Sequence, residues 1–136
     1  MIQNIVRDRF FLRQKARPAR KEDLSIVQDL EDTLTANSYR CVGMAANMIG
    51  KNVAIVCILV GTGVKTFIDP VITAKSGPYE TEEGCLSLDG MRKTTRYKMI
   101  EVRYKDKQWH EHKEKFIGMP AQALQHEIDH LHGVLI

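Results

Sequence analysis

Residues 120–133 read PAQALQHEIDHLHG, and this stretch decides the fold. Pro120 suits the first turn of a helix, because the amide hydrogen that proline lacks has no partner there. Gly133 suits the position just past the end of a helix. The stretch therefore predicts a helix that runs from Pro120 to about Leu131.

This helix carries the pattern H-E-x-x-H at residues 126–130. His126 and His130 are four residues apart and lie on one helical face, so both imidazoles can reach one cation. Glu127 is close enough to handle the proton of a water bound to that cation, because a divalent metal lowers the pKa of such a water toward neutrality. The alternative is a chance match that leaves two exposed histidines on an amphipathic helix. The helical context and the small residues nearby favour a metal site.

A catalytic metal site of this kind needs a third protein ligand and one open coordination position. Only six residues follow His130, so we expect that ligand upstream of the helix. The candidates are Cys41, Cys57, Cys85, His110, His112 or a carboxylate. Cys85 stands out, because Gly84 lets the backbone pass close to a ligand and a thiolate binds iron or zinc strongly. An inert buried thiol is the alternative interpretation of this residue.

The rest of the chain predicts one more helix and several short strands. Between residues 23 and 37 apolar residues recur at helical spacing, at Leu24, Val27, Leu30 and Leu34. The β-branched run Val53–Val60 predicts a buried strand. A turn at residues 61–63 leads to its partner Thr66–Ile68, which Asp69-Pro70 ends or kinks.

Further along, Ser76-Gly77-Pro78 predicts a turn. Two short strands fit Met99–Tyr104 and His112–Ile117, joined around Asp106. The order of elements predicts an α+β fold, with mostly antiparallel strands around the C-terminal helix. We expect residues 1–136 to form a single domain.

The composition excludes several classes of protein. Of the 136 residues, 43% are hydrophobic, which suffices for the core of one globular domain. The longest apolar run, Val53–Val60, is too short for a membrane helix. Charges at Arg7, Asp8 and Arg9 break any secretory signal. We therefore expect no membrane partner and a cytoplasmic location.

The net charge of +3 is too small to argue for a specific nucleic-acid partner, although a weak, transient contact with the ribosome stays open. The basic region Arg7–Lys21 favours a solvated arm packed on the domain over a mitochondrial presequence. Three cysteines, an odd number without a secretion signal, indicate reduced thiols rather than a disulfide framework.

Three segments follow one another along the chain: Gly43-Met44-Ala45-Ala46, Glu83-Gly84-Cys85-Leu86-Ser87 and His126-Glu127-Ile128-Asp129-His130. At all three the sequence resembles the peptide deformylase family. The first segment resembles the family's glycine–alanine motif, and the other two match its cysteine and histidine motifs in full. The resemblance implies removal of the formyl group from the N-terminal formyl-methionine of nascent polypeptides.

The resemblance also implies a ligand set and a mechanism. Cys85, His126 and His130 would hold one divalent metal ion, typically Fe(II), with Zn(II), Ni(II) or Co(II) as replacements. Glu127 would take a proton from the attacking water and return it to the leaving amine. The backbone N–H of Leu86 would face the developing oxyanion.

Other residues would support this site. Glu83 and Arg96 would form an ion pair that holds the cysteine loop, although two unrelated surface charges are the alternative. The substrate backbone would pair with the stretch Val42-Gly43 by β-addition. The methionine side chain would enter an apolar pocket formed by Val42, Met119, Gln122 and Ala123, although such residues also occur as plain core.

The sequence departs from the family's pattern at Met48, where the first motif normally ends in a glutamine that helps hold the substrate's carbonyl oxygen. A thioether cannot donate a hydrogen bond, and losing one oxyanion donor typically costs about a hundred- to a thousandfold in rate. Asn47 carries an amide that reaches the site only if the loop shifts. Cys41 replaces a usual glycine, and Asp89 stands near a place where proline is common.

These departures leave three functions open. The chain is a divergent, active deformylase, or a metal-dependent amidohydrolase that acts on another small acyl amide. The third account is a protein that binds metal and formylated peptides without efficient turnover. A closed structural metal site is disfavoured, because it would need a fourth protein ligand.

Overall fold

The computed structural model describes residues 1–61 and 63–136, and it confirms the predicted α+β fold. The helices are α1 (Arg9–Leu12), α2 (Leu24–Ala36) and α3 (Gly118–Leu131), with 3-10 turns η1 (Lys21–Asp23) and η2 (Ala46–Ile49). The strands are β1 (Gly43–Ala45), β2 (Ile55–Val60), β3 (Gly63–Cys85), β4 (Leu88–Lys105) and β5 (Glu111–Ile117). Neighbouring strands pair antiparallel in the order β1-β2-β3-β4-β5.

Most of the predicted elements are present with shifted ends. The predicted C-terminal helix begins at Gly118 rather than Pro120, and the buried strand begins at Ile55 rather than Val53. The kink expected at Asp69-Pro70 coincides with a register shift between β3 and β4. The turn expected at residues 61–63 includes Thr62, which lies outside the described residues.

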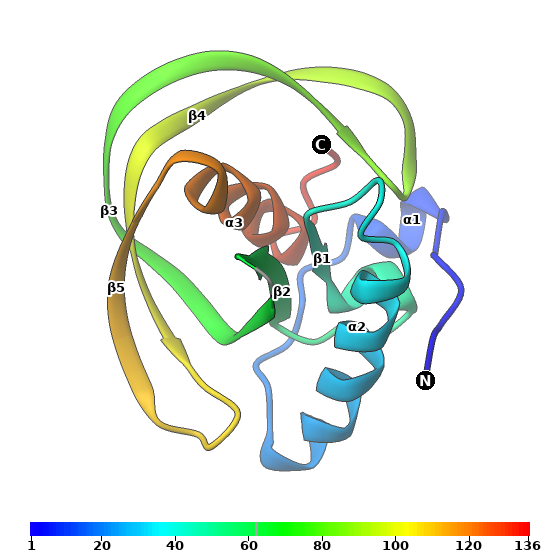
Figure 1. The fold of residues 1–136 in the computed structure, drawn as a ribbon. Helices are drawn as coiled ribbons and strands as arrows, with labels where there is room; N and C mark the ends of the chain where they lie inside the picture. Colours follow the sequence, from blue (N-terminus) through cyan, green and yellow to red (C-terminus); the bar gives the residue numbers. More distant parts are fainter. Residues whose placement is uncertain (62) are drawn as a thin grey trace.

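Helix α3 lies inside the curve that β3, β4 and β5 form (Figure 1). Its side chains Leu124 and Ile128 join Ile55 and Ile58 of β2 in one buried core. Burying one such side chain contributes about 1.5–3 kcal/mol. The core therefore fixes the helix that carries the two predicted histidine ligands. No helix among the described residues is long and apolar enough to cross a membrane.

The long β3–β4 hairpin differs from the prediction. The turn expected at Ser76–Pro78 is wrong, because β3 continues through it and pairs with β4 up to the partners Cys85 and Leu88. Gly77 adopts a positive φ of 73°, yet the pairing of β3 with β4 continues across it without a shift of register. We call residues 78–97, the outer part of this hairpin, the arm. Cys85 ends β3 at the tip of the arm, where it lies against α3.

Gln125 of α3 attaches the arm to the helix. Its Oε1 accepts a hydrogen bond from the backbone N–H of Tyr97 at 2.9 Å, and its Nε2 donates to the Tyr97 carbonyl at 2.9 Å. The same Nε2 donates to the carbonyl of Ala121 at 3.0 Å. One buried amide thus replaces a neighbouring strand as the partner of Tyr97.

The end of α3 lies against the N-terminal segment. The carbonyl of Leu131 accepts a hydrogen bond from the backbone N–H of Ala16 at 2.8 Å. Gly133 follows the helix with a φ of 76°, and a Cβ atom there would lie 2.1 Å from the carbonyl oxygen of Arg13. This junction has room only for glycine.

We expect Gly133→Ala to lower the free energy of unfolding by about 2–4 kcal/mol, because positive φ and a backbone clash act together. The matched control is Gly90→Ala, which has a φ of 79° and no atom within 4 Å of the added Cβ. It should cost about 1 kcal/mol. Urea unfolding at pH 7 measures both values. Equal losses in the two variants would mean that the Arg13 contact does not constrain the fold.

We expect Gln125→Leu to destabilise the protein by about 1–3 kcal/mol, because the backbone groups of Tyr97 lose their partners. The control is Gln28→Leu, whose amide donates only to Asp32 on the surface of α2, at 2.8 Å. That variant should change stability by less than about 0.5 kcal/mol. Amide hydrogen exchange in the arm should accelerate in Gln125→Leu alone. An unchanged exchange rate would show that other contacts hold the arm.

Candidate metal centre

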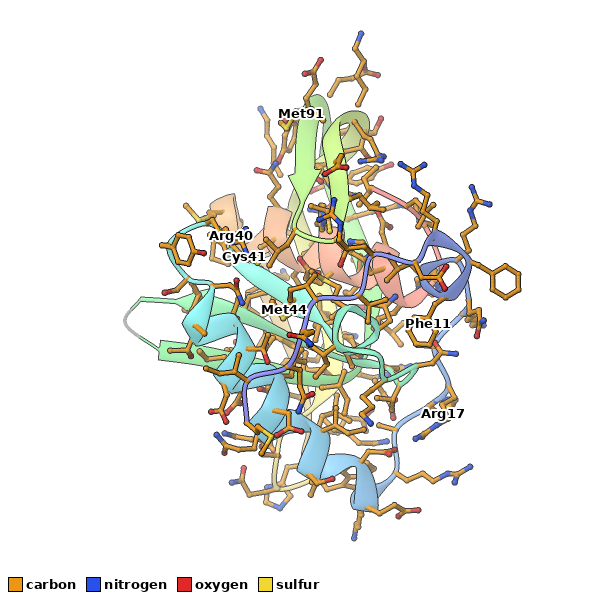
Figure 2. The ribbon with its side chains drawn as sticks, turned by 90° about the vertical axis from the view of Figure 1, so that its right-hand side faces the viewer. Phe11, Arg17, Arg40, Cys41, Met44 and Met91 are labelled. Atoms are coloured by element: carbon orange, nitrogen blue, oxygen red, sulfur yellow. The ribbon has the colours of Figure 1, made fainter. Side chains whose placement is uncertain are left out.

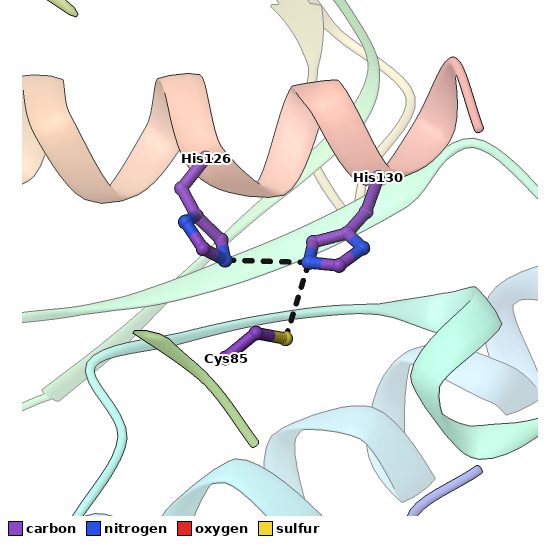
Figure 3. Close-up of side chains that lie close together, drawn as sticks. All are labelled: Cys85, His126 and His130. Atoms are coloured by element: carbon purple, nitrogen blue, oxygen red, sulfur yellow. Dashed lines mark hydrogen bonds between the residues drawn. The ribbon is translucent and has the colours of Figure 1, made fainter. Parts of the chain in front are cut away.

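Three side-chain atoms converge between the arm and α3. Cys85 Sγ lies 3.2 Å from His130 Nε2, which lies 3.3 Å from His126 Nε2 (Figure 3). All three ligand atoms lie within 4.8 Å of one another. In a tetrahedral site with metal–nitrogen bonds of about 2.0–2.1 Å, two nitrogen ligands lie roughly 3.3 Å apart. The spacing and the donor types fit one divalent cation.

The local fold explains why these atoms meet. His126 and His130 point from successive turns of α3, and both side chains are buried. Cys85 is the last residue of β3, at the closed end of the hairpin. The backbone N–H of Ser87 donates to Cys85 Sγ at 3.5 Å, and this bond helps to hold the sulfur in position. Among the described residues, the other predicted ligand candidates do not join this group.

Glu83 lies behind the ligands and orients one of them. His126 Nδ1 donates to Glu83 Oε1 at 2.8 Å, which leaves Nε2 facing Cys85 and His130. A carboxylate behind a histidine ligand fixes the ring and its tautomer. Burial opposes ionisation of Glu83, but hydrogen bonds from His126, Arg96 and Gln122 hold its pKa at about 2.

Arg96 connects this carboxylate to α3 a second time. Its Nη2 lies 2.7 Å from Glu83 Oε1 and its Nη1 lies 2.6 Å from Asp129 Oδ2. The side chains of Arg96 and Glu83 are only 4% and 6% exposed. Gln122 Nε2 adds a further hydrogen bond to Glu83 Oε2 at 2.8 Å. A buried ion pair with all these partners resists rearrangement.

The two histidines occupy different electrostatic surroundings. Burial, together with the charges of His126 and Arg96, lowers the pKa of His130 to about 3, so its imidazole is neutral and ready to bind metal. Burial also opposes protonation of His126, but Cys85, Glu127 and Glu83 raise its pKa to about 10. Metal binding at such a site releases a proton, so affinity rises with pH.

Glu127 is the buried acid beside the ligands. Burial raises its pKa to about 7, where a carboxyl group can both take and give a proton near neutral pH. Its Oε1 is buried and has no hydrogen-bond partner among the described residues. A Cβ atom at Gly43 would lie 3.1 Å from Glu127 Oε2. Glycine at this position therefore lets the carboxylate rest against β1.

A cavity of about 400 Å³ opens onto these groups. Of the residues predicted to contact substrate, Val42, Gln122 and Ala123 line it, and so do Gly43, Met48 and Leu86. Figure 2 shows Met91 on the arm above Arg40 and Cys41, three more residues that border the cavity.

The structure does not bring Met119 to the cavity. Met119 lies in the first turn of α3 and is 64% exposed. The lining residues of α3 begin at Gln122, one turn of helix further on. Helical spacing predicts that Met119 shares a face of α3 with the lining residues, but the cavity does not extend to the first turn of the helix.

Met48 and Asn47 differ in where their side chains point. Met48 is 1% exposed and lines the cavity, and its sulfur accepts a hydrogen bond from the N–H of Ala45 at 3.5 Å. Asn47 Nδ2 instead donates to the backbone carbonyl of His130 at 3.0 Å. The Asn47 amide therefore supports the end of the ligand helix and does not replace the missing glutamine.

The sequence did not predict a role for two residues that join α3 to the arm, Gln125 and Asp129. Gln125 holds the arm, and Asp129 shares Arg96 with Glu83. Both lie within or next to the H-E-x-x-H pattern, on a helix whose other inward residues are mostly apolar or ligands. A polar residue at such a position could have indicated a partner outside the helix. Which residues of the arm are those partners depends on the pairing register of β3 and β4, which the sequence does not reveal.

Comparison with known proteins gives the same family throughout. Residues 2–136 match the family model of polypeptide deformylase. The chain is 51% identical over 136 residues to a peptide deformylase of Clostridium beijerinckii, with 100% of both chains covered. It is 39% identical to peptide deformylase 1 of Clostridium perfringens over 81% of this chain and 76% of the relative.

Solved structures agree with these relatives. A peptide deformylase from Thermotoga maritima has a TM-score of 0.88 and 32% identity, covering 99% of this chain and 95% of its own. One from Legionella pneumophila has a TM-score of 0.89 and 31% identity, covering 99% and 83%. The family is metal-dependent, and Cys85, His126 and His130 of this chain form a group that could hold a metal ion. This chain belongs to the polypeptide deformylase family.

Proposed function

We propose that this chain hydrolyses the formyl group from the N-terminal formyl-methionine of nascent polypeptides. Membership of the family supports a deformylase function and a peptide substrate. The observation that carries the proposal is the buried Glu127 beside three converging ligand atoms at the base of a cavity. The three ligand atoms leave one coordination position toward the cavity, which suits a substrate, whereas a structural metal site would have a fourth protein ligand there.

Cys85, His126 and His130 would hold the metal. One thiolate and two imidazoles suit iron and zinc alike, and we propose Fe(II), with Zn(II), Ni(II) and Co(II) as functional replacements. Such a cation supplies Lewis acidity and lowers the pKa of water near neutrality. The carboxylate of Glu83 would keep the His126 ring in its binding tautomer.

Glu127 would act as the acid–base group. Its raised pKa of about 7 suits a residue that takes a proton from water and then gives it to the leaving amine. The developing negative charge on the formyl oxygen needs a donor, and we assign this role to the N–H of Leu86, which lines the cavity. Met48 adds no donor there, so turnover would be slower than with glutamine.

The free edge of β1 would bind the substrate backbone. The backbone carbonyl of Val42 points toward β2, where it accepts a hydrogen bond from the N–H of Leu59 at 2.9 Å. Alternate residues of an antiparallel strand bond to opposite sides, so the N–H and C=O of Gly43 face away from β2. An added peptide strand can pair with them. The thiol of Cys41 lies 2.7 Å from the Gly43 oxygen and would yield to the peptide.

The substrate side chain would enter the cavity beside Val42 and Ala123, with Gln122 at its polar end. We further propose that residues 1–136 act as one domain in the cytoplasm. Exposed Arg9 and Arg13 in the N-terminal segment support a weak, transient attraction to the ribosome.

Formyl-Met-Ala-Ser hydrolysis by the Fe(II) protein under anaerobic conditions tests the reaction. We expect Glu127→Gln to lower kcat by about a hundred- to ten-thousandfold without loss of bound metal, because the proton acceptor is gone. Glu111→Gln, which alters an exposed glutamate of β5, is the control and should leave kcat unchanged. Full activity in Glu127→Gln would remove Glu127 from the mechanism.

Met48→Gln should raise kcat by about tenfold or more, because an amide donor would then face the cavity. If neither the unsubstituted protein nor Met48→Gln hydrolyses formyl-Met-Ala-Ser, but both still bind it, the result would favour the third account, a protein that binds formylated peptides without efficient turnover. Turnover of other acyl amides alone would favour the second account, an amidohydrolase with a different substrate.

Metal titration tests the ligand set. We expect Cys85→Ala to weaken Co(II) binding by at least about a hundredfold, because a ligand bond is lost. Cys41→Ala is the matched control, since its thiol borders the same cavity but does not join the ligand group, and it should retain affinity within about threefold. Equal affinities in the two variants would refute Cys85 as a ligand.

A further inference from the structure

Arg7, in the N-terminal segment, contacts the turn that carries Cys85. Its Nη1 donates to the backbone carbonyl of Leu86 at 3.3 Å, and its Nη2 lies 2.5 Å from Asp89 Oδ1. The residues lie 79 and 82 positions away in the sequence. The guanidinium thus joins the beginning of the chain to the tip of the hairpin at two points.

The contacted carbonyl belongs to a peptide group that serves the metal centre. The C=O of Leu86 and the N–H of Ser87 are two ends of one planar peptide unit. That N–H donates to Cys85 Sγ at 3.5 Å. Fixing and polarising the oxygen therefore also fixes the hydrogen bond to the sulfur, because hydrogen-bonded groups in series polarise one another.

The same carbonyl contact constrains Leu86 itself. Leu86 and Ser87 are the two turn residues between the paired Cys85 and Leu88. The N–H of Leu86, to which we assign the oxyanion, belongs to the preceding peptide unit, Cys85–Leu86. The two units share the Cα atom of Leu86, so fixing the Leu86 carbonyl restricts the range of directions open to that N–H. With Met48 unable to donate, that N–H carries more of the task, and its direction matters more.

The contact with Asp89 holds the guanidinium in place without adding much stability. The side chains of Arg7 and Asp89 are 54% and 91% exposed, and ion pairs so exposed contribute little to the free energy of unfolding. The two contacts of Arg7 should therefore affect the local geometry of the turn. This effect should appear in the properties of the metal centre rather than in the melting temperature.

We propose that Arg7 is a positioning residue that sets the orientation of the Leu86–Ser87 peptide unit, and through it the sulfur ligand and the oxyanion donor. The proposal rests on the proposed function. Arg7 touches neither substrate nor metal. The motifs at residues 83–87 and 126–130 would then depend on a contact from outside both.

The test compares Arg7→Ala with Arg9→Ala in the Co(II) protein. Arg9 is an exposed arginine of α1 with no side-chain hydrogen bond to another described residue. We expect the sulfur-to-cobalt charge-transfer band to shift in Arg7→Ala only, and kcat to fall about three- to tenfold at nearly constant KM. Arg7→Lys keeps the charge but loses the planar guanidinium, so its band position and kcat should lie between those of Arg7→Ala and of the unsubstituted protein.

A second comparison isolates the oxyanion donor. In a Met48→Gln background the loss caused by Arg7→Ala should shrink, because a second donor then shares the charge. A purely structural effect of Arg7 would be the same in both backgrounds. An unshifted band with unchanged kcat, or equal effects in Arg9→Ala, would overturn the proposal. If the protein binds cobalt but hydrolyses no formyl peptide, the proposed function fails, and the band still decides the role of Arg7.

Discussion

The buried contact of Glu83 with Arg96 and His126 is the interaction on which the metal centre depends. Taking a carboxylate and a guanidinium out of water is costly unless every polar atom finds a partner. Here Glu83 also accepts from Gln122, and Arg96 also reaches Asp129. The arm and α3 are thereby joined behind the ligands, and separating them would leave charges buried without partners. This constraint, more than the ligands themselves, sets the distance between Cys85 and the two histidines.

The same burial serves the chemistry next to this network. Glu83 accepts a hydrogen bond from His126 and Glu127 follows His126 in the chain, yet their surroundings push their pKa values apart, to about 2 and about 7. Glu83 accepts hydrogen bonds from Arg96, His126 and Gln122. Glu127 is buried against Gly43, and its Oε1 has no hydrogen-bond partner among the described residues. One carboxylate therefore stays charged and orients a ligand, while the other can exchange a proton.

The sequence predicted the parts of the fold that carry a strong period or a fixed chemical pattern. Helices α2 and α3 follow from apolar spacing and end signals, and β2 from its β-branched run. The arm could not be predicted, because its less exposed positions are mostly polar residues and so show no apolar alternation in the sequence. In addition, Gly77-Pro78 has the composition of a turn. The ligand residues follow from motifs, whereas the contacts of Gln125 and Arg7 depend on strand register. Met119 was misplaced because helical spacing gives a face and not the length of a cavity.

The two sides of the centre are held by different means. Around the two histidines, Glu83 and Arg96 of the arm and the core around Leu124 are buried, so a substitution there disturbs many partners at once. On the cysteine side, the turn at Leu86 is held by strand pairing and by an exposed guanidinium, which water can replace at little cost in stability. The exposed side can therefore change in geometry while the fold and the metal ligands persist. In the proposed mechanism Met48 supplies no hydrogen-bond donor while the set of metal-binding residues is unchanged, so the rate would depend most directly on the direction of the Leu86 N–H.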